Sequence, residues 1–349
     1  MINLNEIDFI KLSDVDNEKL FKFYSIAYPN RNKVIYKNWK WIYRTSLNGL
    51  EPIIAVYKKD IIGHAGLIST NILYNGKVLR GIWFVDLYIL SNFRNIGLGK
   101  ILTKKWMKLE EYHLTFCNHS SLRLFKKLGW LENDNYYKSC KILNPLKWLP
   151  LIKSIDNRIL NKINFFKYFN KIDLAKGVNL LKLSENQKIL DDLIKSESSI
   201  IPKDTSNLEI LRDVNWLNWR IFQSPFIESY YFFVIEKSFV IVSLLNEYNK
   251  KKLNIIFSKY ENEYYETLIN KYIIKWSINN NVDIIWLHIN NLEKNISANK
   301  FYTKKFDLNF ACNSQNLLLN NDILKNISNI DGVDSDTDLL NYKNYSTYG

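Results

Sequence analysis

Apolar and polar positions follow two different periods along the chain, and the changes of period mark where helices and strands are expected. Leu20, Phe21 and Tyr24 form one stripe with helical spacing, and Asp14 or Asp16 precedes it as a candidate helix cap. A second helix is expected over residues 33–44. Runs with the period of strands follow at residues 53–57, 61–69 and 82–90.

Turn residues and a further group of periodic runs complete the pattern of the first part of the chain. Asn75-Gly76 between apolar flanks predicts a two-residue hairpin turn. An amphipathic helix is expected over residues 98–112, then a strand over 114–117 and a helix over 120–128. Because helical and strand periods alternate throughout, the sequence predicts an α/β (α+β) fold.

The second half of the chain repeats this order at a nearly constant offset. Trp41 and Trp219 are 178 residues apart, as are the turn residues Lys59 and Lys237. An offset of 177 relates Asn118 to Asn295, Ser121 to Ala298, Leu124 to Phe301, Phe125 to Tyr302 and Lys127 to Lys304. We interpret the shared offset as an internal duplication of two similarly folded domains with little sequence identity.

The duplication divides the chain into domains at residues 1–143 and 183–320, a linker at 144–182 and a polar tail at 321–349. The linker is basic and aromatic, so one interpretation is peripheral membrane contact through residues 144–172. The favoured interpretation is a linker and helix packed across the domain junction. Residues 334–338 of the tail resemble the start of a calcium loop, but Leu339 stands where that loop needs Gly, so no metal site is expected.

Composition and charge restrict the class of protein. Hydrophobic residues at 47% and charged residues at 24% are typical of globular proteins. The formal net charge of +13 favours anionic partners such as phosphorylated cofactors, nucleic acid or an acidic membrane face. Three cysteines without a CxxC pair indicate a reducing compartment. With neither a signal peptide nor a transmembrane segment evident, a cytoplasmic location is expected.

A glycine-containing loop carries the strongest signal for chemistry. Residues 94–99 (RNIGLG) follow the expected strand at 84–90 and open the expected helix at 98–112. Unsatisfied N–H groups and the helix dipole make such a helix start an anion site, and Gly97 and Gly99 let a diphosphate approach the backbone. A simple tight turn is the alternative interpretation. The spacing is neither that of a Walker loop nor that of a dinucleotide fingerprint.

The second signal is the segment 118–130 (NHSSLRLFKKLGW), in which Asn118 follows a short strand and Gly129 suits a left-handed helix end. Together the two segments resemble the GNAT superfamily of N-acetyltransferases. The first GNAT signature, [Q/R]xxGx[G/A], is matched by Arg94, Gly97 and Gly99. The second is matched by Asn118, Ser121, Leu124, Phe125, Lys127, Gly129 and Trp130.

The resemblance implies two GNAT-like domains, each a mixed, mostly antiparallel twisted sheet flanked by helices. It implies that acetyl-CoA, the acyl donor, lies where the fourth and fifth strands separate, with a backbone N–H near Tyr88–Leu90 polarising the thioester carbonyl. The donor-binding residues that it implies are Leu87, Ile89, Leu90, Arg94, Asn95, Ile96, Gly97, Leu98, Gly99, Lys100, Asn118, Ser121 and Phe125.

Direct attack of an amine on a thioester needs a base for the amine and a proton for the departing thiolate. At the position where GNAT enzymes often carry a tyrosine that acts as the general acid, this chain has Phe125. Tyr88 or water is therefore left as the proton donor to the thiolate. Asp86 is the favoured base, with a satisfied polar strand residue as the alternative. His119 is a further candidate base at the mouth of the cleft. His64 is expected to be a hydrogen-bonded core residue, and Cys117 a buried thiol.

The second domain is expected to be a degenerate copy. Where the first has its glycine loop, residues 258–266 read SKYENEYYE, whose carboxylates would repel a diphosphate. The favoured function is an acetyl-CoA-dependent N-acetyltransferase acting on a small amine, for example a nucleotide-linked amino sugar. The alternatives are a tRNA-dependent aminoacyl transferase of the double-GNAT type and a non-catalytic acyl-CoA-binding protein.

Overall fold

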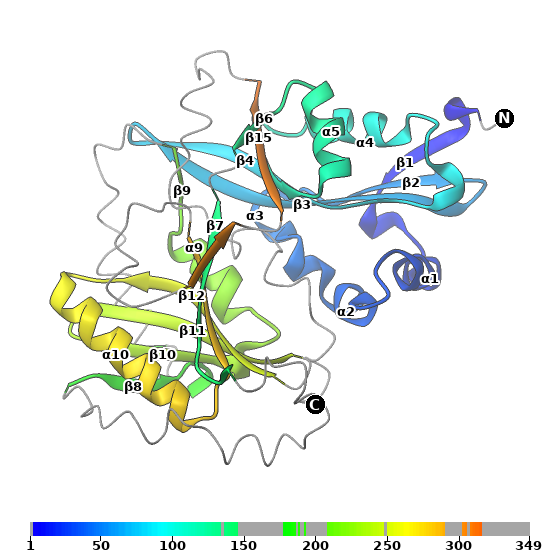
Figure 1. The fold of residues 1–349 in the computed structure, drawn as a ribbon. Coiled ribbons are helices and arrows are strands. Elements are labelled where there is room, and N and C mark those ends of the chain that lie inside the picture. The colour runs from blue at the N-terminus through cyan, green and yellow to red at the C-terminus, as the bar shows by residue number, and fades with distance from the viewer. Residues whose placement is uncertain are drawn as a thin grey trace. The chain divides into compact units, whose positions relative to one another are not determined.

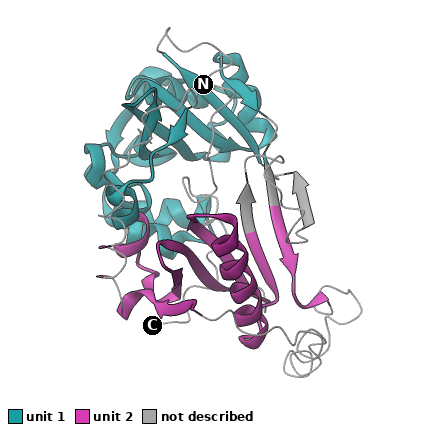
Figure 2. Cartoon of the chain, turned by 90° about the vertical axis from the view of Figure 1, so that its left-hand side faces the viewer, with its two compact units in different colours: residues 1–136, 200–219, 306–342 teal, residues 137–199, 220–305, 343–349 magenta. Residues whose placement is uncertain are grey.

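The computed structural model describes residues 3–133, 136–145, 177–185, 188, 192, 208–247, 250–289, 302–305 and 308–315. The chain forms two compact units (Figure 2): unit 1 comprises residues 1–136, 200–219 and 306–342, and unit 2 comprises residues 137–199, 220–305 and 343–349. Each unit contains one sheet of mixed strand directions, flanked by helices (Figure 1). The predicted α/β (α+β) fold is therefore confirmed.

Unit 1 is built on a sheet with the strand order β1-β2-β3-β4-β5-β15-β6, in which β9 also pairs with β3. Helices α4 and α5 cover one face of this sheet, and α1 and α2 lie on the opposite face (Figure 1). The strands are β1 (Ile7–Lys11), β2 (Ile53–Tyr57), β3 (Asp60–Tyr74), β4 (Lys77–Ile89), β5 (Tyr112–Cys117), β6 (Leu131–Asn133), β9 (Glu209–Ile210) and β15 (Asn309–Ser314). The helices are α1 (Asn17–Ala27), α2 (Asn32–Ile42), α3 (Thr45–Asn48), α4 (Leu98–Trp106), α5 (His119–Lys127) and α9 (Val214–Leu217).

Local sequence signals explain where several of these elements begin and turn. Asp16 caps α1, because its carboxylate accepts from the backbone N–H groups of Glu18 and Lys19 at 3.0 and 3.1 Å. The predicted hairpin turn at Asn75-Gly76 is confirmed: both residues have positive φ, 46° and 71°, as a type I′ turn requires.

Helix α4 is shorter than the sequence pattern predicts. Apolar residues with helical spacing continue to residue 112, but the helix ends at Trp106. The Trp106 indole is fully buried and donates to the Ala65 carbonyl at 3.1 Å, which anchors this end to the sheet. Tyr112 already pairs with Gly81 in the parallel ladder between β4 and β5, so the chain has to turn between residues 106 and 112. The prediction of a helix over 98–112 was wrong in its last turn and a half.

Unit 2 has a sheet with the order β8-β10-β11-β12-β13-β7-β14. Its strands are β7 (Tyr137–Ile142), β8 (Asn179–Lys182), β10 (Tyr230–Ile235), β11 (Ser238–Glu247), β12 (Lys250–Lys259), β13 (Ile284–Ile289) and β14 (Tyr302–Lys305). Helix α10 (Glu263–Asn279) follows β12 and packs on the sheet with Ile269 and Ile273 buried. Its place after β12 matches the place of α4 after β4.

The two sheets correspond strand by strand, apart from an exchange. β15, near the end of the chain, lies between β5 and β6 in the sheet of unit 1. β7, which directly follows β6 in the sequence, lies at the same position in the sheet of unit 2, between β13 and β14. Each sheet is thus completed by a strand from the other half of the chain. The colours of Figure 1 show this, since β15 is orange beside blue-green strands.

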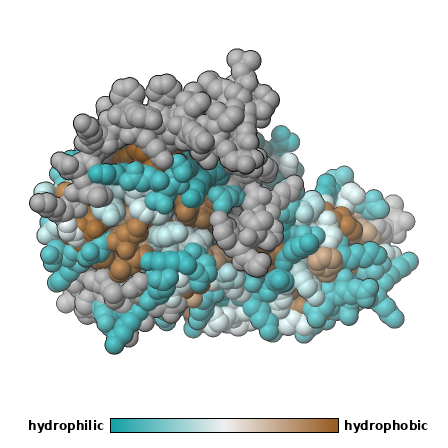
Figure 3. Space-filling model, turned by 90° about the horizontal axis from the view of Figure 1, so that it is seen from below, coloured by the Kyte–Doolittle hydropathy of each residue, from teal (hydrophilic) through white to brown (hydrophobic). Residues whose placement is uncertain are grey.

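Hydrophobic residues on the face seen in Figure 3 lie in separate patches among hydrophilic ones. Large apolar side chains that are exposed include Phe21, Ile26 and Tyr264, and such scattered exposure is ordinary for globular proteins. Among the described residues, no helix combines the length and the apolar character that crossing a bilayer requires. Residues 146–176 of the expected linker, and residues 334–339, lie outside the described residues.

The position of β15 allows an engineered disulfide to join two segments that are far apart in the sequence. Asn309 lies directly opposite Cys117 in the antiparallel ladder between β5 and β15, and opposed residues have the Cα separation that a disulfide needs. Burial raises the pKa of the Cys117 thiol to about 12, so the folded protein will react slowly. After refolding of Asn309→Cys in an oxidising glutathione buffer, peptide mapping should find residues 117 and 309 joined. Asn313→Cys, opposite His113, is the matched control and should give no such link to residue 117.

Candidate functional site

Strands β4 and β5 separate in the middle of the sheet of unit 1. They pair in parallel over Gly81–Trp83 and Tyr112–Leu114, and this ladder then stops although both strands continue. Just beyond it, the Thr115 hydroxyl donates to the Phe84 carbonyl at 2.8 Å. A cavity of about 360 Å³ opens where the strands part.

Both faces of the sheet contribute to this cavity. Trp106 of α4 and Phe125 of α5 come from one face, and the turn of residues 27–31, between α1 and α2, comes from the other. The residues that line it are Ala27, Tyr28, Pro29, Asn30, Arg31, Phe84, Val85, Asp86, Leu87, Trp106, Thr115, Phe116, Cys117, Asn118, Ser121, Phe125 and Leu308. The cavity therefore connects the two faces through the sheet.

A β-bulge at Asp86 lies beside the opening. His64 is opposite Tyr88 and Gly66 is opposite Val85, so β4 has one more residue than β3 in this stretch. Asp86 takes up the extra length in the left-handed region, with φ 52°, which costs most non-glycine residues about 1 kcal/mol or more. Its carbonyl accepts two hydrogen bonds, from His64 Nδ1 at 2.9 Å and from the Tyr28 hydroxyl at 2.6 Å.

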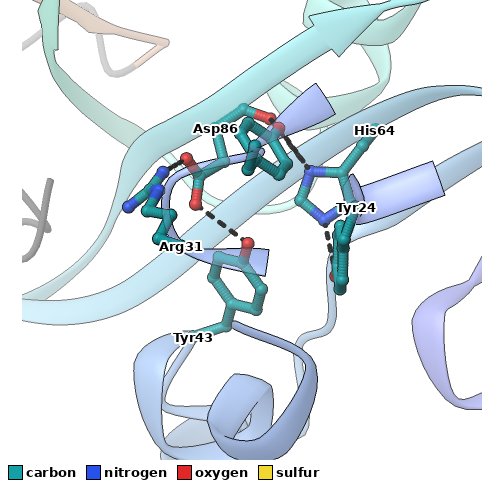
Figure 4. Close-up of polar contacts among 6 residues, drawn as sticks. Tyr24, Arg31, Tyr43, His64 and Asp86 are labelled. Atoms are coloured by element: carbon teal, nitrogen blue, oxygen red, sulfur yellow. Dashed lines mark hydrogen bonds and ion pairs between the residues drawn. The ribbon is translucent and has the colours of Figure 1, made fainter. Parts of the chain in front are cut away.

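The carboxylate of Asp86 is held as firmly as its carbonyl. It forms an ion pair with the Arg31 guanidinium, and its other oxygen accepts from the Tyr43 hydroxyl at 2.9 Å (Figure 4). The side chains of Arg31 and Asp86 are only 7% and 3% exposed, so the pair is screened little by water. Among the described residues that line the cavity, Asp86 is the only one with an acidic side chain.

His64 joins this network as a neutral imidazole. It is fully buried, and desolvation, followed by the nearby positive charge of Arg31, lowers its pKa to about 3. Since Nδ1 donates to the Asp86 carbonyl, Nε2 is left to accept from the Tyr24 hydroxyl at 3.3 Å. The prediction that His64 is a hydrogen-bonded core residue is confirmed.

The N-terminus of α4 has the features of an anion site. Gly97 occupies its cap position with φ 89°, and no side chain caps the helix there. A Cβ placed on Gly97 would meet no atom within 4 Å, so the backbone borders open space. Arg94 lies beside the loop, where its Nε donates to the Ile89 carbonyl at 3.0 Å and its guanidinium lies 5.4 Å from the centre of the Tyr88 ring. Exposed amides next to this cation favour a bound anion.

Helix α10 of unit 2 begins differently. The side chain of Asn262 caps it by accepting from the Tyr265 N–H at 3.0 Å, and Glu263 and Glu266 lie in its first turn. A capped and acidic helix start disfavours an anion. The two units thus place a helix at the same point of the sheet, but only α4 has an uncapped start without acidic residues.

The residues that sequence analysis placed in the second motif lie at the end of β5. Asn118 caps α5 by accepting from the Ser121 N–H at 2.9 Å, and Asn118, Ser121 and Phe125 all line the cavity. The prediction of a buried Cys117 thiol is confirmed: the side chain is 6% exposed, and burial raises its pKa to about 12.

The three expected catalytic residues are in different surroundings. Asp86 lines the cavity, whereas Tyr88 and His119 are not among its lining residues. The Tyr88 ring packs near those of Phe23 and Tyr28. His119 is exposed, with Nδ1 3.4 Å from Asn309 Nδ2.

Sequence reasoning missed the residues that reach Asp86 from α1 and α2, namely Tyr28, Arg31 and Tyr43. They precede Asp86 by 58, 55 and 43 residues. No local pattern connects them with a strand so far along the chain. The Pro29-Asn30-Arg31 break between two helical runs was a signal that a turn lies there, but not that it faces the sheet.

Comparisons with known proteins agree with this geometry. Residues 16–130 match the Acetyltransferase (GNAT) family. A GCN5-related N-acetyltransferase from Anabaena variabilis has a TM-score of 0.58 at 11% identity, over 89% of this chain and 73% of that one. One from Kribbella flavida has 0.55 at 9%, over 90% and 72%.

A more distant kind of enzyme shares the fold as well. N-myristoyltransferase from Saccharomyces cerevisiae, whose structure has myristoyl-CoA bound, has a TM-score of 0.53 at 12% identity, over 93% of this chain and 84% of that one. At such low identities these likenesses show the fold alone. No curated protein matches the sequence of the chain.

The neutral state of His64 predicts how stability changes with pH. Unfolded His64 takes up a proton below about pH 6.5, whereas folded His64 does so only near pH 3. Between these values the unfolded state binds more protons, so stability falls as the pH falls. From pH 6 to 4 this residue should remove about 1.4 kcal/mol per pH unit from the free energy of unfolding.

Urea titrations from pH 6 to 4 give the free energy of unfolding at each pH. The change of this free energy per pH unit should be smaller by about 1.4 kcal/mol in His64→Gln than in the unmodified chain. His119→Gln, which changes an exposed histidine outside this network, is the matched control for the substitution itself. In the unmodified protein, the His64 ring signals in NMR should not titrate above pH 4. A midpoint near 6.5 would contradict the neutral assignment.

Proposed function

We propose that the protein is an acyl-CoA-dependent N-acyltransferase whose donor site lies in unit 1. One observation carries this proposal: β4 and β5 part around a cavity, and the helix that follows β4, α4, has an uncapped, glycine-bearing N-terminus that packs against Ile89 at the end of β4. Residues 94–100 do not themselves line the cavity. The family match of residues 16–130 supports the same reaction class. The acyl group that is transferred is proposed to be acetyl.

The residues present fit a coenzyme A thioester. The amides that open α4 would hold the diphosphate, with exposed Arg94 and Lys100 adding positive charge. Asn118, Ser121 and Phe125 would border the pantetheine arm inside the cavity. The bound donor supplies an activated acyl group.

The chain's own groups then prepare the acceptor amine. Asp86, the carboxylate of the cavity wall, would take the proton of the acceptor ammonium. Arg31 and Tyr43 keep this carboxylate in one orientation, so its geometry is set before the acceptor arrives. The bulge at Asp86 alters the direction of the backbone that follows, and a backbone N–H near Tyr88 and Ile89 would polarise the acyl carbonyl. The N–H of Leu90 does not serve, because it donates to the Ile62 carbonyl at 2.9 Å.

Internal duplication is part of the proposal. The strand order of the two sheets is the same when β1, β2, β3, β4 and β5 are matched with β8, β10, β11, β12 and β13. The segments 1–143 and 183–320 would then each encode one fold, with the last strands exchanged. The offset of 177 does not hold at their ends, because it pairs Phe125 and Lys127 of helix α5 with Tyr302 and Lys304 of strand β14. Unit 2 would be the degenerate copy, since α10 begins with a cap and two carboxylates.

The acceptor is proposed to be an amine that also carries negative charge, such as a nucleotide-linked amino sugar. The net charge of +13 favours such a molecule over a polyamine.

Substitution of Gly97 tests the donor site with two side chains of one shape. Asn and Asp both tolerate the left-handed backbone of residue 97, and a Cβ at this position would meet no neighbouring atom. Calorimetry with coenzyme A should show a modest loss for Asn and a further loss of roughly tenfold or more for Asp, because only Asp repels the diphosphate. Asn262→Ala, at the start of α10, is the control and should leave binding unchanged. Equal affinities of the Asn and Asp variants would remove the anion site from this loop.

Substitution of Asp86 tests the base. With an amine panel that contains a nucleotide-linked amino sugar and spermidine, Asp86→Asn should lower thiol release by roughly 10²- to 10⁴-fold while coenzyme A still binds. Tyr43→Phe keeps the carboxylate and should cost far less. Because Asp86→Asn removes the carboxylate of the buried ion pair with Arg31, the variant Arg31→Gln/Asp86→Asn checks that the loss of activity is not caused by a loss of folding. Unchanged turnover across pH in Asp86→Asn would exclude it as the base.

A further inference from the structure

Among the described residues, three hydroxyl groups line the cavity, and two of them are already hydrogen-bonded within the protein. The Tyr28 hydroxyl donates to the Asp86 carbonyl at 2.6 Å, and the Thr115 hydroxyl donates to the Phe84 carbonyl at 2.8 Å. Both donors hold strand β4 beside the opening. Neither proton is available to a bound molecule unless a backbone carbonyl of β4 loses its partner.

The third hydroxyl belongs to Ser121 in the first turn of α5. Its backbone N–H is taken by the Asn118 side chain at 2.9 Å, but its Oγ makes no hydrogen bond within the described part of the chain. The residue is partly buried rather than sealed off from solvent. Ser121 thus presents to the cavity a donor that is free to bind a ligand and to exchange its proton with water.

Helix α5 lies beside the anion loop as well as beside the cavity. A Cβ placed on Gly99 would be 3.5 Å from Leu124 Cδ2, so the start of α4 packs against α5. Ser121 is one turn before Phe125, which also lines the cavity and offers only carbon atoms. A chain that extends from the α4 N-terminus into the cavity therefore passes along the face of α5 that carries the Ser121 hydroxyl.

We propose that Ser121 is a catalytic residue, whose hydroxyl donates a hydrogen bond to the departing thiolate sulfur and stabilises its negative charge. This inference rests on the proposed acyltransferase function. The C–N bond forms and the C–S bond breaks; the proton of the amine goes to Asp86, and the sulfur leaves as a thiolate that is hydrogen-bonded to Ser121 Oγ–H. Ser121 keeps its own proton; the thiolate takes a proton from solvent, and Asp86 returns its proton to solvent.

Other protic groups of the cavity suit this task less well. The Cys117 thiol is a weak hydrogen-bond donor, and burial raises its pKa to about 12. The Arg31 guanidinium is ion-paired with Asp86. Ser121 requires no rearrangement of the network before it donates.

The test compares three serine substitutions in the full chain. Ser121→Ala removes the hydroxyl, Ser121→Thr retains it, and Ser120→Ala changes an exposed neighbour that does not line the cavity. Two quantities are measured for each: the dissociation constant of coenzyme A by calorimetry, and kcat for thiol release from acetyl-CoA with the best amine. Thermal melts establish that each variant is folded.

If Ser121 acts on the sulfur, Ser121→Ala should lower kcat by roughly ten- to hundredfold, the effect of one hydrogen bond to a charged group. Coenzyme A affinity should change little, and Ser121→Thr and Ser120→Ala should stay near the unmodified kcat. Equal kcat in Ser121→Ala, equal losses in the Ala and Thr variants, or a loss confined to affinity would each overturn the inference. If the unmodified protein releases no thiol with any amine, the proposed function and this inference are both overturned.

Discussion

The left-handed backbone at Asp86 is the constraint on which the opening in unit 1 depends. A bulge in β4 shifts the strand by one residue against β3, and the parallel ladder with β5 has already ended at Trp83 and Leu114. An isolated bulge of this kind would be free to slip, since a regular pairing with β3 would recover hydrogen bonds. Four side chains prevent this by fixing Asp86 at two points. His64 and Tyr28 hold its carbonyl, and Arg31 and Tyr43 hold its carboxylate.

The same network explains why a buried ion pair is kept at this point of the sheet. Burial of Arg31 and Asp86 costs desolvation energy that their attraction only partly returns, so an apolar pair would serve stability as well or better. What an apolar pair cannot do is hold the carboxylate in one orientation at a cavity wall. His64 must also stay neutral, because a second positive charge near Arg31 would weaken the pair. Desolvation by burial, followed by the positive charge of Arg31, lowers the pKa of His64 to about 3 and keeps it neutral.

Sequence reasoning succeeded where the structural cause is local. The Asn75-Gly76 turn and the cap at Asp16 depend on residues within a few positions of each other, and both are present. The Asn118 cap and the Gly97 helix start are local features as well. The end of α4 at Trp106 was missed, because it is set by an indole bonded to a carbonyl on β3. The partners of Asp86 were missed for the same reason: they come from helices that the fold, rather than the sequence pattern, brings beneath β4.

The exchange of β7 and β15 could not be predicted from strand patterns either, because either strand would complete either sheet. Its consequence reaches the site. β15 is preceded by Leu308, which lines the cavity, and Asn309 donates to the Cys117 carbonyl at 3.3 Å. Part of the wall of the cavity in unit 1 is thus supplied by Leu308, almost two hundred positions after Cys117. A nascent chain that contains only the first half lacks both Leu308 and β15, the strand between β5 and β6. The site can therefore form only after the second half of the chain has been made, whatever the second unit itself does.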